Sequence, residues 1–600
     1  MNASNEPPIE QSSALRRALC HVLCESLIDY LPGTQLGLSE LTDEGFHVDL
    51  LLPRALSPES FPELEHRMRE RLSSAAGPEC LRVPAEQAIA WFREQNQPYQ
   101  LAEAEARLAQ GHPTLLLVRS PLLLALCDAA PAALASVADA AFELRNVAGA
   151  YFRGDAANVM MTRVTAWAFE TRAELDAARE HHEHALARDH KRIGRELELF
   201  AFDDAIGAGL PLWLPNGTAV RDELEGLMRE LEFEAGFERV ATPHLAHKEL
   251  YEKTGHLPYF ADGMFPLMQR AGEHSPVFAL RPMNCPHHHR IFAARKRSYR
   301  ELPLRLSEYG HVYRYEDSGA VSGLLRTRCM CMNDGHIYCT KEQVSAELHA
   351  VLDMHERVYS ILGLSDYRVR LSTRGQSHLA HAANNKFVDD PAGWRLAENM
   401  LREVLEARGL TYFEGPGEAA FYGPKIDFQF RMVTGREETA STLQLDFAVA
   451  ERLDLSYVGP AGEAARPFIL HRAPLGTHER FVALLIERYG GAFPTWLAPV
   501  QACVLPVSDE LEPYAREVQQ ALRAQRVRAQ LEPAEHSLSK RIRRVVQRKV
   551  PHVLVVGERE RAERTVTLRR YGTDSQRVLP LTAACGEITA AIAARKLDVI

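Results

Sequence analysis

One cysteine and two histidines, far apart in a chain of 600 residues, have the side chains that a zinc ion binds. They are Cys285, His336 and His471, which are separated by 51 and 135 residues. One thiolate and two imidazoles leave a fourth position open, which is typical of a catalytic zinc rather than a structural one. No short finger motif has this spacing, so only a folded domain could bring the three together. A buried thiol and two core histidines are the alternative.

The composition indicates a globular protein of several domains. The chain is 46% hydrophobic and 25% charged, and it is longer than a single hydrophobic core serves. Its longest apolar stretch, residues 114–127, is interrupted by Arg119 and Pro121, so we expect no membrane span. The N-terminus lacks the pattern of a signal peptide, and the ten cysteines lack the spacing of a disulfide framework. A cytoplasmic protein with reduced thiols follows.

The net charge of −10 argues against a nucleic-acid binder, but the charge is unevenly distributed. Residues 521–570 hold 14 lysines and arginines and only 5 aspartates and glutamates. This segment can contact a polyanion while the rest of the chain stays acidic. A solvated helix face is the alternative.

The pattern of the first part predicts a mixed α/β domain over residues 1–165. A helical pattern covers residues 13–30, and strand-like runs follow at 45–50 and 114–118. Residues 166–199 form the expected linker, with one long exposed helix over 172–199. Its histidines are expected to be polar positions on a solvated face rather than metal ligands: His181, His182, His184 and His190.

Residues 200–498 hold strands rich in β-branched and aromatic residues, which predicts an α+β domain built on an antiparallel sheet. Residues 499–600 alternate between strand and helix patterns and predict a small α/β domain that contains the basic segment. The predicted elements are strands at 502–506, 526–532 and 553–557 and helices at 512–524, 537–549 and near 588–596. Since we find no glycine-rich phosphate loop, side chains must bind any nucleotide.

Several segments resemble the signature motifs of class II aminoacyl-tRNA synthetases. Residues 313–319 with 325–328 resemble motif 2, residues 476–481 resemble motif 3, and residues 237–243 resemble motif 1, which forms the dimer. Five further segments narrow the resemblance to the threonyl-tRNA synthetases: Glu252-Lys253-Thr254-Gly255-His256, Arg281-Pro282-Met283-Asn284-Cys285-Pro286, and residues 420–426, 442–447 and 493–499. Together they extend the resemblance over residues 13–600.

The resemblance implies a homodimer that uses ATP to join L-threonine to tRNA(Thr) through a threonyl-adenylate. It implies one Zn²⁺ per subunit, held by Cys285, His336 and His471, and Mg²⁺ bound with ATP. The implied fold is a class II catalytic domain on an antiparallel sheet, an N-terminal α/β editing-like domain and a C-terminal α/β anticodon-binding domain. The arginines expected to contact the phosphates of tRNA are Arg541, Arg543, Arg544 and Arg548.

The resemblance also assigns the arginines that adenylate formation needs, since a guanidinium is planar and always charged. Arg314 matches the arginine that contacts the α-phosphate and the substrate carboxylate, and Arg326 and Arg480 match those that hold the triphosphate. A surface salt bridge is the alternative for any one of them. Glu316 and Gln444 complete the ATP set. The residues assigned to the amino acid are Asp334, Tyr422, Lys425, Gln444 and His256.

Zinc recognition predicts a specific weakness toward serine. Threonine can offer its amino group and its β-hydroxyl to zinc, whereas valine has no oxygen there. Serine keeps both groups and lacks only a methyl, a difference of about 1–3 kcal/mol. The family corrects this error in an N-terminal domain whose site combines His-x-x-x-His with Cys-x-x-x-His.

The N-terminal domain of this chain departs from that pattern. Residues 149–155 resemble the editing domain, but Arg17 stands at the first histidine position, His21 at the second, and no histidine follows Cys127. We therefore predict a domain that has kept its fold and lost the hydrolysis of misacylated tRNA. The small ubiquitin-like domain that often precedes it is expected to be absent.

The catalytic segments depart from the family in two places. The usual Cys-Pro-Gly-His becomes Cys285-Pro286-His287-His288, and the usual Gly-Phe-Thr-Gln becomes Cys329-Met330-Cys331-Met332. Met330 thus replaces an aromatic expected to stack on adenine, and Met332 replaces a glutamine near the amino acid; thioethers are adaptable enough to keep such a pocket working. Cys329 and Cys331 could bind a metal, but alternation along a strand favours packing.

These departures motivate a rival prediction, a specialised paralogue that either resists an inhibitor or loads an amino acid onto an acceptor other than tRNA. The basic C-terminal domain favours a tRNA acceptor. A regulatory tRNA-binding module without catalysis is disfavoured, because Arg314, Arg326 and Arg480 are all present.

Overall fold

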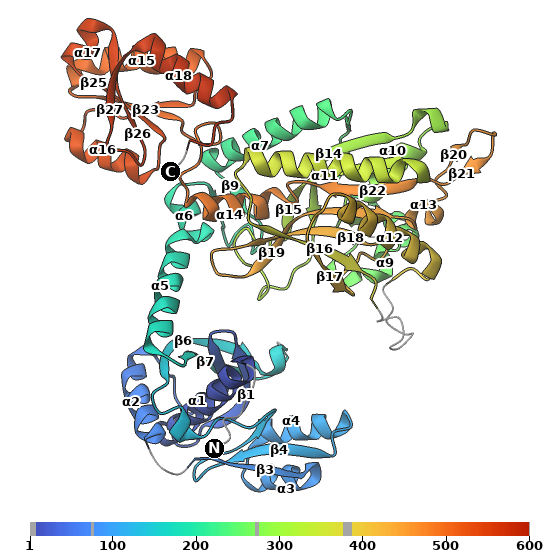
Figure 1. The fold of residues 1–600 in the computed structure, drawn as a ribbon, viewed down its shortest axis with the longest axis vertical. Coiled ribbons are helices and arrows are strands. Elements are labelled where there is room, and N and C mark those ends of the chain that lie inside the picture. The colour runs from blue at the N-terminus through green and yellow to red at the C-terminus, as the bar shows by residue number, and fades with distance from the viewer. Residues whose placement is uncertain (1–7, 74–76, 156, 271–274, 376–386, 599–600) are drawn as a thin grey trace. The chain divides into compact units, whose positions relative to one another are not determined.

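The computed structural model describes residues 8–73, 77–155, 157–270, 275–375 and 387–598. The chain divides into two compact units, residues 1–183 and 184–600 (Figure 1). None of the helices in the described part of the chain is long and apolar enough to cross a membrane.

The first unit contains two antiparallel sheets. The larger has the order β1 (Gln35–Thr42), β2 (Gly45–Leu51), β7 (Met160–Phe169), β6 (Ala141–Tyr151), and the smaller has the order β3 (Glu79–Pro84), β4 (Thr114–Arg119), β5 (Leu124–Cys127). Its helices are α1 (Pro8–Tyr30), α2 (Phe61–Leu72), α3 (Ala85–Glu94) and α4 (Pro98–Ala109). The structure confirms three predicted elements: the helix over residues 13–30 lies within α1, and the strands at 45–50 and 114–118 lie within β2 and β4.

The long helix predicted over residues 172–199 is wrong, because the structure has two helices there. α5 (Arg172–Arg188) ends before Asp189, whose carboxylate accepts a hydrogen bond from the backbone N–H of Lys191 at 2.6 Å and caps α6 (His190–Glu196). His190 is buried rather than solvated, and its Nδ1 lies 2.8 Å from Oε1 of Glu487. The predicted boundary after residue 165 falls inside β7, which continues to Phe169.

An eight-stranded sheet forms the centre of the second unit (Figure 1). Its order is β10 (Glu238–Arg239), β14 (Leu304–Tyr313), β15 (Cys329–Cys339), β22 (Phe468–Ala473), β19 (Glu437–Asp446), β18 (Lys425–Arg431), β16 (Tyr367–Thr373), β17 (Tyr412–Pro416). The two outermost pairs are parallel and all inner pairs are antiparallel. The antiparallel sheet predicted for this region is confirmed.

The two faces of this sheet have different roles because successive side chains of a strand point to opposite faces. On one face Ile337, Leu443 and Leu470 enter a large hydrophobic core. That core also contains apolar residues of five helices: α6, α7 (Pro215–Glu234), α11 (Val344–Ile361), α12 (Pro391–Ala407) and α14 (His478–Tyr489). The residues next in sequence to these strand positions therefore face the other side of the sheet.

Smaller elements border that other side. They are α8 (Lys248–Thr254), α9 (His256–Tyr259), α10 (Cys285–Ala293) and α13 (Val449–Arg452), with a sheet of order β11 (Leu245–His247), β13 (Val277–Leu280), β12 (Met268–Gln269). Two short strand pairs complete the region: β8 (Phe200–Ala201) with β9 (Leu212–Trp213), and β20 (Tyr457–Val458) with β21 (Ala464–Ala465).

The C-terminal part is a five-stranded sheet of order β24 (Ala529–Leu531), β23 (Ala502–Pro506), β25 (His552–Val556), β26 (Thr565–Arg570), β27 (Gln576–Pro580). Its helices are α15 (Glu512–Ala524), α16 (Leu538–Gln547), α17 (Glu558–Glu563) and α18 (Leu581–Ala593). The first three strands are parallel, as the alternation of strand and helix predicted, and β26 and β27 add an antiparallel edge that the prediction missed.

A buried ion pair joins helix α7 to the centre of the main sheet. Nη2 of Arg472 donates to Oε1 of Glu232 at 2.7 Å, and both side chains are at most 1% exposed. Asn333 on β15 donates to the same carboxylate oxygen at 2.9 Å. Gly335 leaves the space that Arg472 fills, since a Cβ atom there would lie 2.5 Å from its Nε.

Removing one partner of this pair should destabilise the second unit strongly. We expect Glu232→Ala to lower its free energy of unfolding by about 3–5 kcal/mol, because Arg472 would stay buried without its carboxylate. The matched control is Glu234→Ala on the same helix, which breaks an exposed pair with Arg357 and should cost less than about 1 kcal/mol. Differential scanning calorimetry of the full chain measures both; equal shifts in the two variants would contradict the expectation.

Candidate functional site

One row of side chains crosses five strands of the main sheet because their registers align. Leu306 lies opposite His336, and His336 lies opposite His471. His471 in turn lies opposite Gln444, and Gln444 lies opposite Lys425. The row belongs to the face away from the helix-covered core. The five strands thereby place residues distant in sequence side by side.

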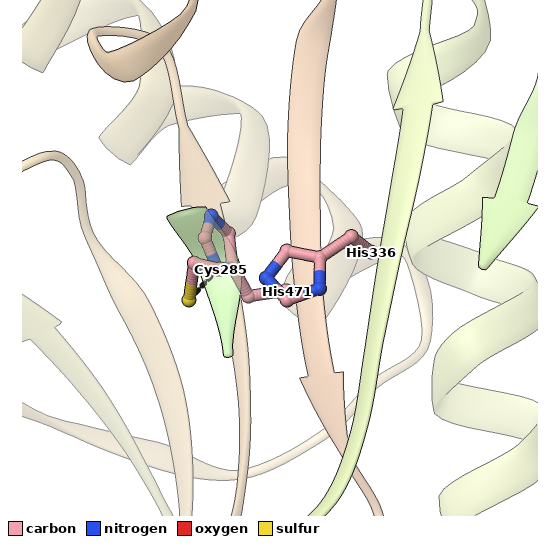
Figure 2. Close-up of side chains that lie close together, drawn as sticks. All are labelled: Cys285, His336 and His471. Atoms are coloured by element: carbon pink, nitrogen blue, oxygen red, sulfur yellow. Dashed lines mark hydrogen bonds between the residues drawn. The ribbon is translucent and has the colours of Figure 1, made fainter. Parts of the chain in front are cut away.

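Cys285, His336 and His471 meet on this face, as Figure 2 shows. Cys285 is the first residue of α10, and its Sγ lies 3.4 Å from Nδ1 of His471. One ligand atom of each residue lies within 4.8 Å of the ligand atoms of the other two. The three residues that were candidates by side-chain type alone are therefore neighbours.

The second nitrogen of each imidazole is held by another buried side chain. Nε2 of His471 lies 3.2 Å from Oδ2 of Asp446. Nδ1 of His336 lies 2.8 Å from Nδ1 of His288, whose Nε2 lies 3.0 Å from Oε2 of Glu308. Such contacts orient metal-binding histidines and select their tautomers. Because these contacts occupy the other ring nitrogens, Nδ1 of His471 and Nε2 of His336 are the nitrogens available as ligand atoms beside Cys285.

This donor set fits a zinc ion. Nε2 of His336 is buried and has no hydrogen-bond partner among the described residues, which costs free energy unless a ligand binds it. Burial, together with Asp334 and Asp446, raises the pKa of the Cys285 thiol. A cation between these atoms would satisfy the nitrogen and stabilise the thiolate.

A cavity of about 330 Å³ lies beside the triad. Four residues that the resemblance assigns to the amino acid line it: Asp334, Tyr422, Lys425 and Gln444. Their polar groups are held in place by neighbours. The hydroxyl of Tyr422 donates to Oε1 of Gln444 at 2.5 Å, and Nζ of Lys425 donates to Oδ2 of Asp427 at 2.8 Å. The cavity thus presents fixed polar groups beside the zinc-binding atoms.

A second cavity of about 230 Å³ is lined by Glu316, Met330, Arg326 and Arg480. Nε of Arg326 donates to Oε2 of Glu316 at 2.8 Å, and Nη1 of Arg480 donates to the carbonyl of Thr439 at 2.9 Å. These arginines are suited to an anionic ligand. The arginines assigned to the triphosphate therefore line the same cavity as Glu316 and as Met330, the residue at the position expected to stack on adenine.

Arg314 lines both cavities. Its Nε is buried without a hydrogen-bond partner among the described residues, so the guanidinium has a donor to offer a ligand. Met332 lines the first cavity and Met330 the second, so each replacement noted in the sequence contacts a different part of the site.

His256 does not line the first cavity, contrary to its assignment as a substrate-binding residue. It is 2% exposed, with Nδ1 at 2.8 Å from Oγ1 of Thr254 and Nε2 at 3.2 Å from Sδ of Met283. Met283 does line the cavity. His256 therefore supports the wall of the cavity from behind.

Sequence reasoning missed the residues that hold the two imidazoles, namely Asp446, His288 and Glu308. Asp446 stands in the segment 442–447, and His288 stands in the histidine run 287–289, so both segments were noted for other reasons. Only strand pairing and the position of α10 bring these side chains to His471 and His336.

Arg541 cannot contact a tRNA phosphate as predicted, because it is 1% exposed inside the C-terminal domain. Its guanidinium donates to the backbone carbonyls of His536, Glu532 and Val507. The amphipathic helix α16 turns this arginine inward and its neighbours outward. Arg543 and Arg544 are exposed and Arg548 is half-buried.

The first unit contains a cavity of about 340 Å³ lined by Arg17, His21 and Cys127. Nε of Arg17 donates to the carbonyl of Ala130 at 3.1 Å, and Sγ of Cys127 donates to the carbonyl of Ala129 at 2.6 Å. The three positions matched to the editing motif thus share one cavity.

Two family models match the chain. The model of the tRNA synthetase class II core domain (G, H, P, S and T) matches residues 269–489, and the model of the anticodon binding domain matches residues 501–590. The first range contains the triad, all residues that line the second cavity and all but Phe260 of those that line the first. The second range covers most of the C-terminal domain.

Curated relatives match almost the whole chain. The threonine–tRNA ligase of Thermus thermophilus is 42% identical over 586 residues, which are 96% of this chain and 88% of the relative. That of Halalkalibacterium halodurans is 40% identical over 94% of this chain and 86% of the relative.

A solved structure described as the RNA binding domain of threonyl-tRNA synthetase from Cryptosporidium parvum is also similar. It has a TM-score of 0.63 and 33% identity, and the match covers 67% of this chain and 98% of that one. A prolyl-tRNA synthetase of the same organism, at 14% identity and a TM-score of 0.52, shares the fold over 68% of this chain and 75% of that one. The chain therefore belongs to the threonyl-tRNA synthetases, the class II ligases that join threonine to tRNA.

Proposed function

We propose that the chain forms threonyl-adenylate from L-threonine and ATP, transfers the threonyl group to tRNA(Thr), and does not itself hydrolyse Ser-tRNA(Thr). The observation that carries the first part is the position of Arg314 between the two cavities. A guanidinium there reaches a carboxylate on one side and an α-phosphate on the other.

Adenylate formation joins a carboxylate oxygen of threonine to the α-phosphorus and releases pyrophosphate. Negative charge builds on the phosphorus oxygens during this step, and Arg314 offsets it without reorganisation. Arg326 and Arg480 bind the outer phosphates in the second cavity, where Glu316 orients Arg326. Mg²⁺ bound with ATP would neutralise part of the triphosphate charge in this cavity.

The first cavity selects the amino acid. Zinc held by Cys285, His336 and His471 would supply a Lewis-acidic position for the amino group and β-hydroxyl of threonine. Asp334 accepts the hydroxyl hydrogen, while Tyr422 stacks on His471 with 4.8 Å between ring centroids. Valine brings no oxygen and would leave these polar groups unpaired, which is costly.

The cavity of the first unit supports the loss of editing. Arg17 stands where the family has a histidine, and its guanidinium is bonded to a backbone carbonyl. Burial lowers the pKa of His21 and so favours the neutral ring, but its Nε2 has no hydrogen-bond partner among the described residues to orient it. One imidazole that shares a cavity with Cys127, and whose Nε2 lies 3.9 Å from Oε2 of Glu25, is a poor substitute for the four-residue hydrolytic site.

The chain would act as a homodimer in the cytoplasm. Phe233 on α7 is 83% exposed, and Leu245 on β11 and Met268 on β12 are 43% and 42% exposed. These exposed apolar side chains support a partner copy in contact with α7 or with the β11–β13–β12 sheet. For tRNA(Thr), Arg543, Arg544 and Arg548 remain the proposed phosphate contacts, without Arg541.

A specialised paralogue is the second candidate, and one observation favours it. Met330 lines the second cavity and Met332 the first, which supports an altered fit of adenine, of the amino acid or of an inhibitor. An inhibitor-resistant paralogue would catalyse the same reaction as the first candidate. A paralogue that transfers the amino acid to an acceptor other than tRNA would catalyse a different one.

Exchange of labelled pyrophosphate into ATP, followed by transfer to tRNA(Thr), tests the reaction. We expect efficient exchange with threonine, about 10–200-fold less efficient exchange with serine, and about 10⁴-fold less with valine. Charging of tRNA(Thr) should follow. Exchange without charging would favour a different acceptor, and no exchange with any amino acid would contradict both candidates.

Cys285→Ala should remove one zinc per chain and lower threonine-dependent exchange by at least about 100-fold, because a thiolate ligand is lost. Inductively coupled plasma mass spectrometry measures the zinc. Cys339→Ala is the matched control, since it removes a buried thiol from the same sheet without touching the triad. Unchanged zinc content and exchange in Cys285→Ala would refute the role of the site.

Purified chain mixed with Ser-tRNA(Thr) should leave it intact at the spontaneous rate of hydrolysis. The matched variant is His21→Ala, which removes the one histidine of the editing pattern that remains. Deacylation by the parent chain that disappears in His21→Ala would show that the N-terminal cavity still edits.

A further inference from the structure

A second group of metal-binding side chains lies on the opposite, helix-covered face of the main sheet. It consists of Glu225 on α7, Cys331 on β15 and His478, the first residue of α14. One ligand atom of each lies within 4.8 Å of the other two. Cys331 and His336 are five residues apart on β15, and an odd separation places them on opposite faces. This group is therefore separate from the Cys285 triad.

The backbone around this group is held by hydrogen bonds. The N–H of Asn333 donates to the carbonyl of Gly476 at 3.0 Å, and Met332 pairs with Thr477 in an isolated bridge. The N–H of Cys331 donates to Oε2 of Glu479 at 2.9 Å. Strand β15 and the start of α14 are thus fixed to each other before any ligand binds.

The imidazole of His478 is buried, and neither nitrogen has a hydrogen-bond partner among the described residues. Its side chain is 0% exposed. The ring stacks on Tyr309, with 5.8 Å between centroids and 17° between planes. Packing accounts for the ring but not for two unsatisfied nitrogens, which are costly to bury.

The carboxylate of Glu225 also has one oxygen to offer. Oε2 accepts a hydrogen bond from Arg229 at 2.7 Å. Oε1 lies 3.8 Å from Nδ1 of His478 and 3.7 Å from Nη2 of Arg221, both longer than a hydrogen bond. Thus Oε1, the imidazole and the thiol face one another without bonding.

The charges around this group leave room for a cation. Arg221 and Arg229 face the carboxylate of Glu225, and Arg221 also lies near Glu479. Arg239 and Asp222 add one charge of each sign near Glu225, so the arginines and carboxylates balance. A divalent ion would displace the proton of the Cys331 thiol and gain a thiolate ligand.

We propose that Glu225, Cys331 and His478 form a second zinc site, in addition to the one zinc per chain that the triad would hold. A thiolate, an imidazole and a carboxylate are the ligands that zinc prefers, at about 2.0–2.3 Å. Binding would draw the three atoms together by about 1 Å from their present separation. A water molecule would complete the tetrahedron.

The consequence of this site would be structural. It joins α7, β15 and α14 beside the second cavity, whose lining includes Met330, Thr477 and Arg480. Met330 precedes Cys331, and Arg480 follows His478 by two residues. An ion that holds Cys331 to His478 would therefore hold the wall of the ATP cavity.

Zinc counting on the full chain tests the proposal. After loading with ZnCl₂ and desalting, the parent chain should retain two zinc ions, and Cys331→Ser and His478→Gln should each retain one. The matched control is Cys329→Ala, which removes a thiol from the same strand and should retain two. One zinc in the parent chain, or two in either Cys331→Ser or His478→Gln, would overturn the proposal.

Cobalt spectroscopy keeps the test valid where a variant folds poorly. Cys285→Ala has only the second thiolate site, so titration with CoCl₂ should give one thiolate-to-cobalt charge-transfer band per chain. The double variant Cys285→Ala with Cys331→Ser should give none, while Cys285→Ala with Cys329→Ala should keep the band. No band in Cys285→Ala with a parent-like unfolding transition, or a band that survives Cys331→Ser, would refute the site.

Discussion

The register of the antiparallel strands is the constraint on which the catalytic unit depends. It sets His336 beside His471 and His471 beside Gln444, although these residues are far apart in sequence. A shift of the pairing between β15 and β22 by one residue would point the His336 side chain into the hydrophobic core. It would also point Ile337 to the face that carries the triad, which we call the substrate face. The candidate zinc triad, the polar lining of the first cavity and the supporting core therefore share one structural cause.

Both faces of the sheet carry buried polar groups, and each group is stabilised by neighbours from other elements. On the substrate face, Asp446 and His288 hold the imidazoles. On the helix face, Arg472 and Glu232 fix α7 against the central strands. The imidazoles of the triad are thus held by neighbouring side chains, and groups fixed in this way can stabilise a transition state without reorganising.

Local patterns predicted the elements well where hydrophobic periodicity was strong, as in α15 and β23, whose bounds match the expected residues 512–524 and 502–506. They failed where a single residue or a distant contact decided the outcome. Asp189 caps α6 and thereby ends the predicted long helix. His190 can be buried because its imidazole contacts the carboxylate of Glu487, which lies almost three hundred residues further along the chain. The inward turn of Arg541 likewise follows from helical phase and carbonyls elsewhere in its domain.

By itself, the sequence determined the chemistry available to this protein: one thiol and two imidazoles for a metal, three arginines for phosphates, and a basic C-terminal segment. These follow from residue type and from motifs that are short in sequence. Only the tertiary structure decided that Arg314 lies between two cavities, that His256 lies behind one, and that Cys331 meets His478. The physical reason is that strand pairing and helix packing bring together residues separated by tens to hundreds of positions, and no local periodicity encodes those contacts.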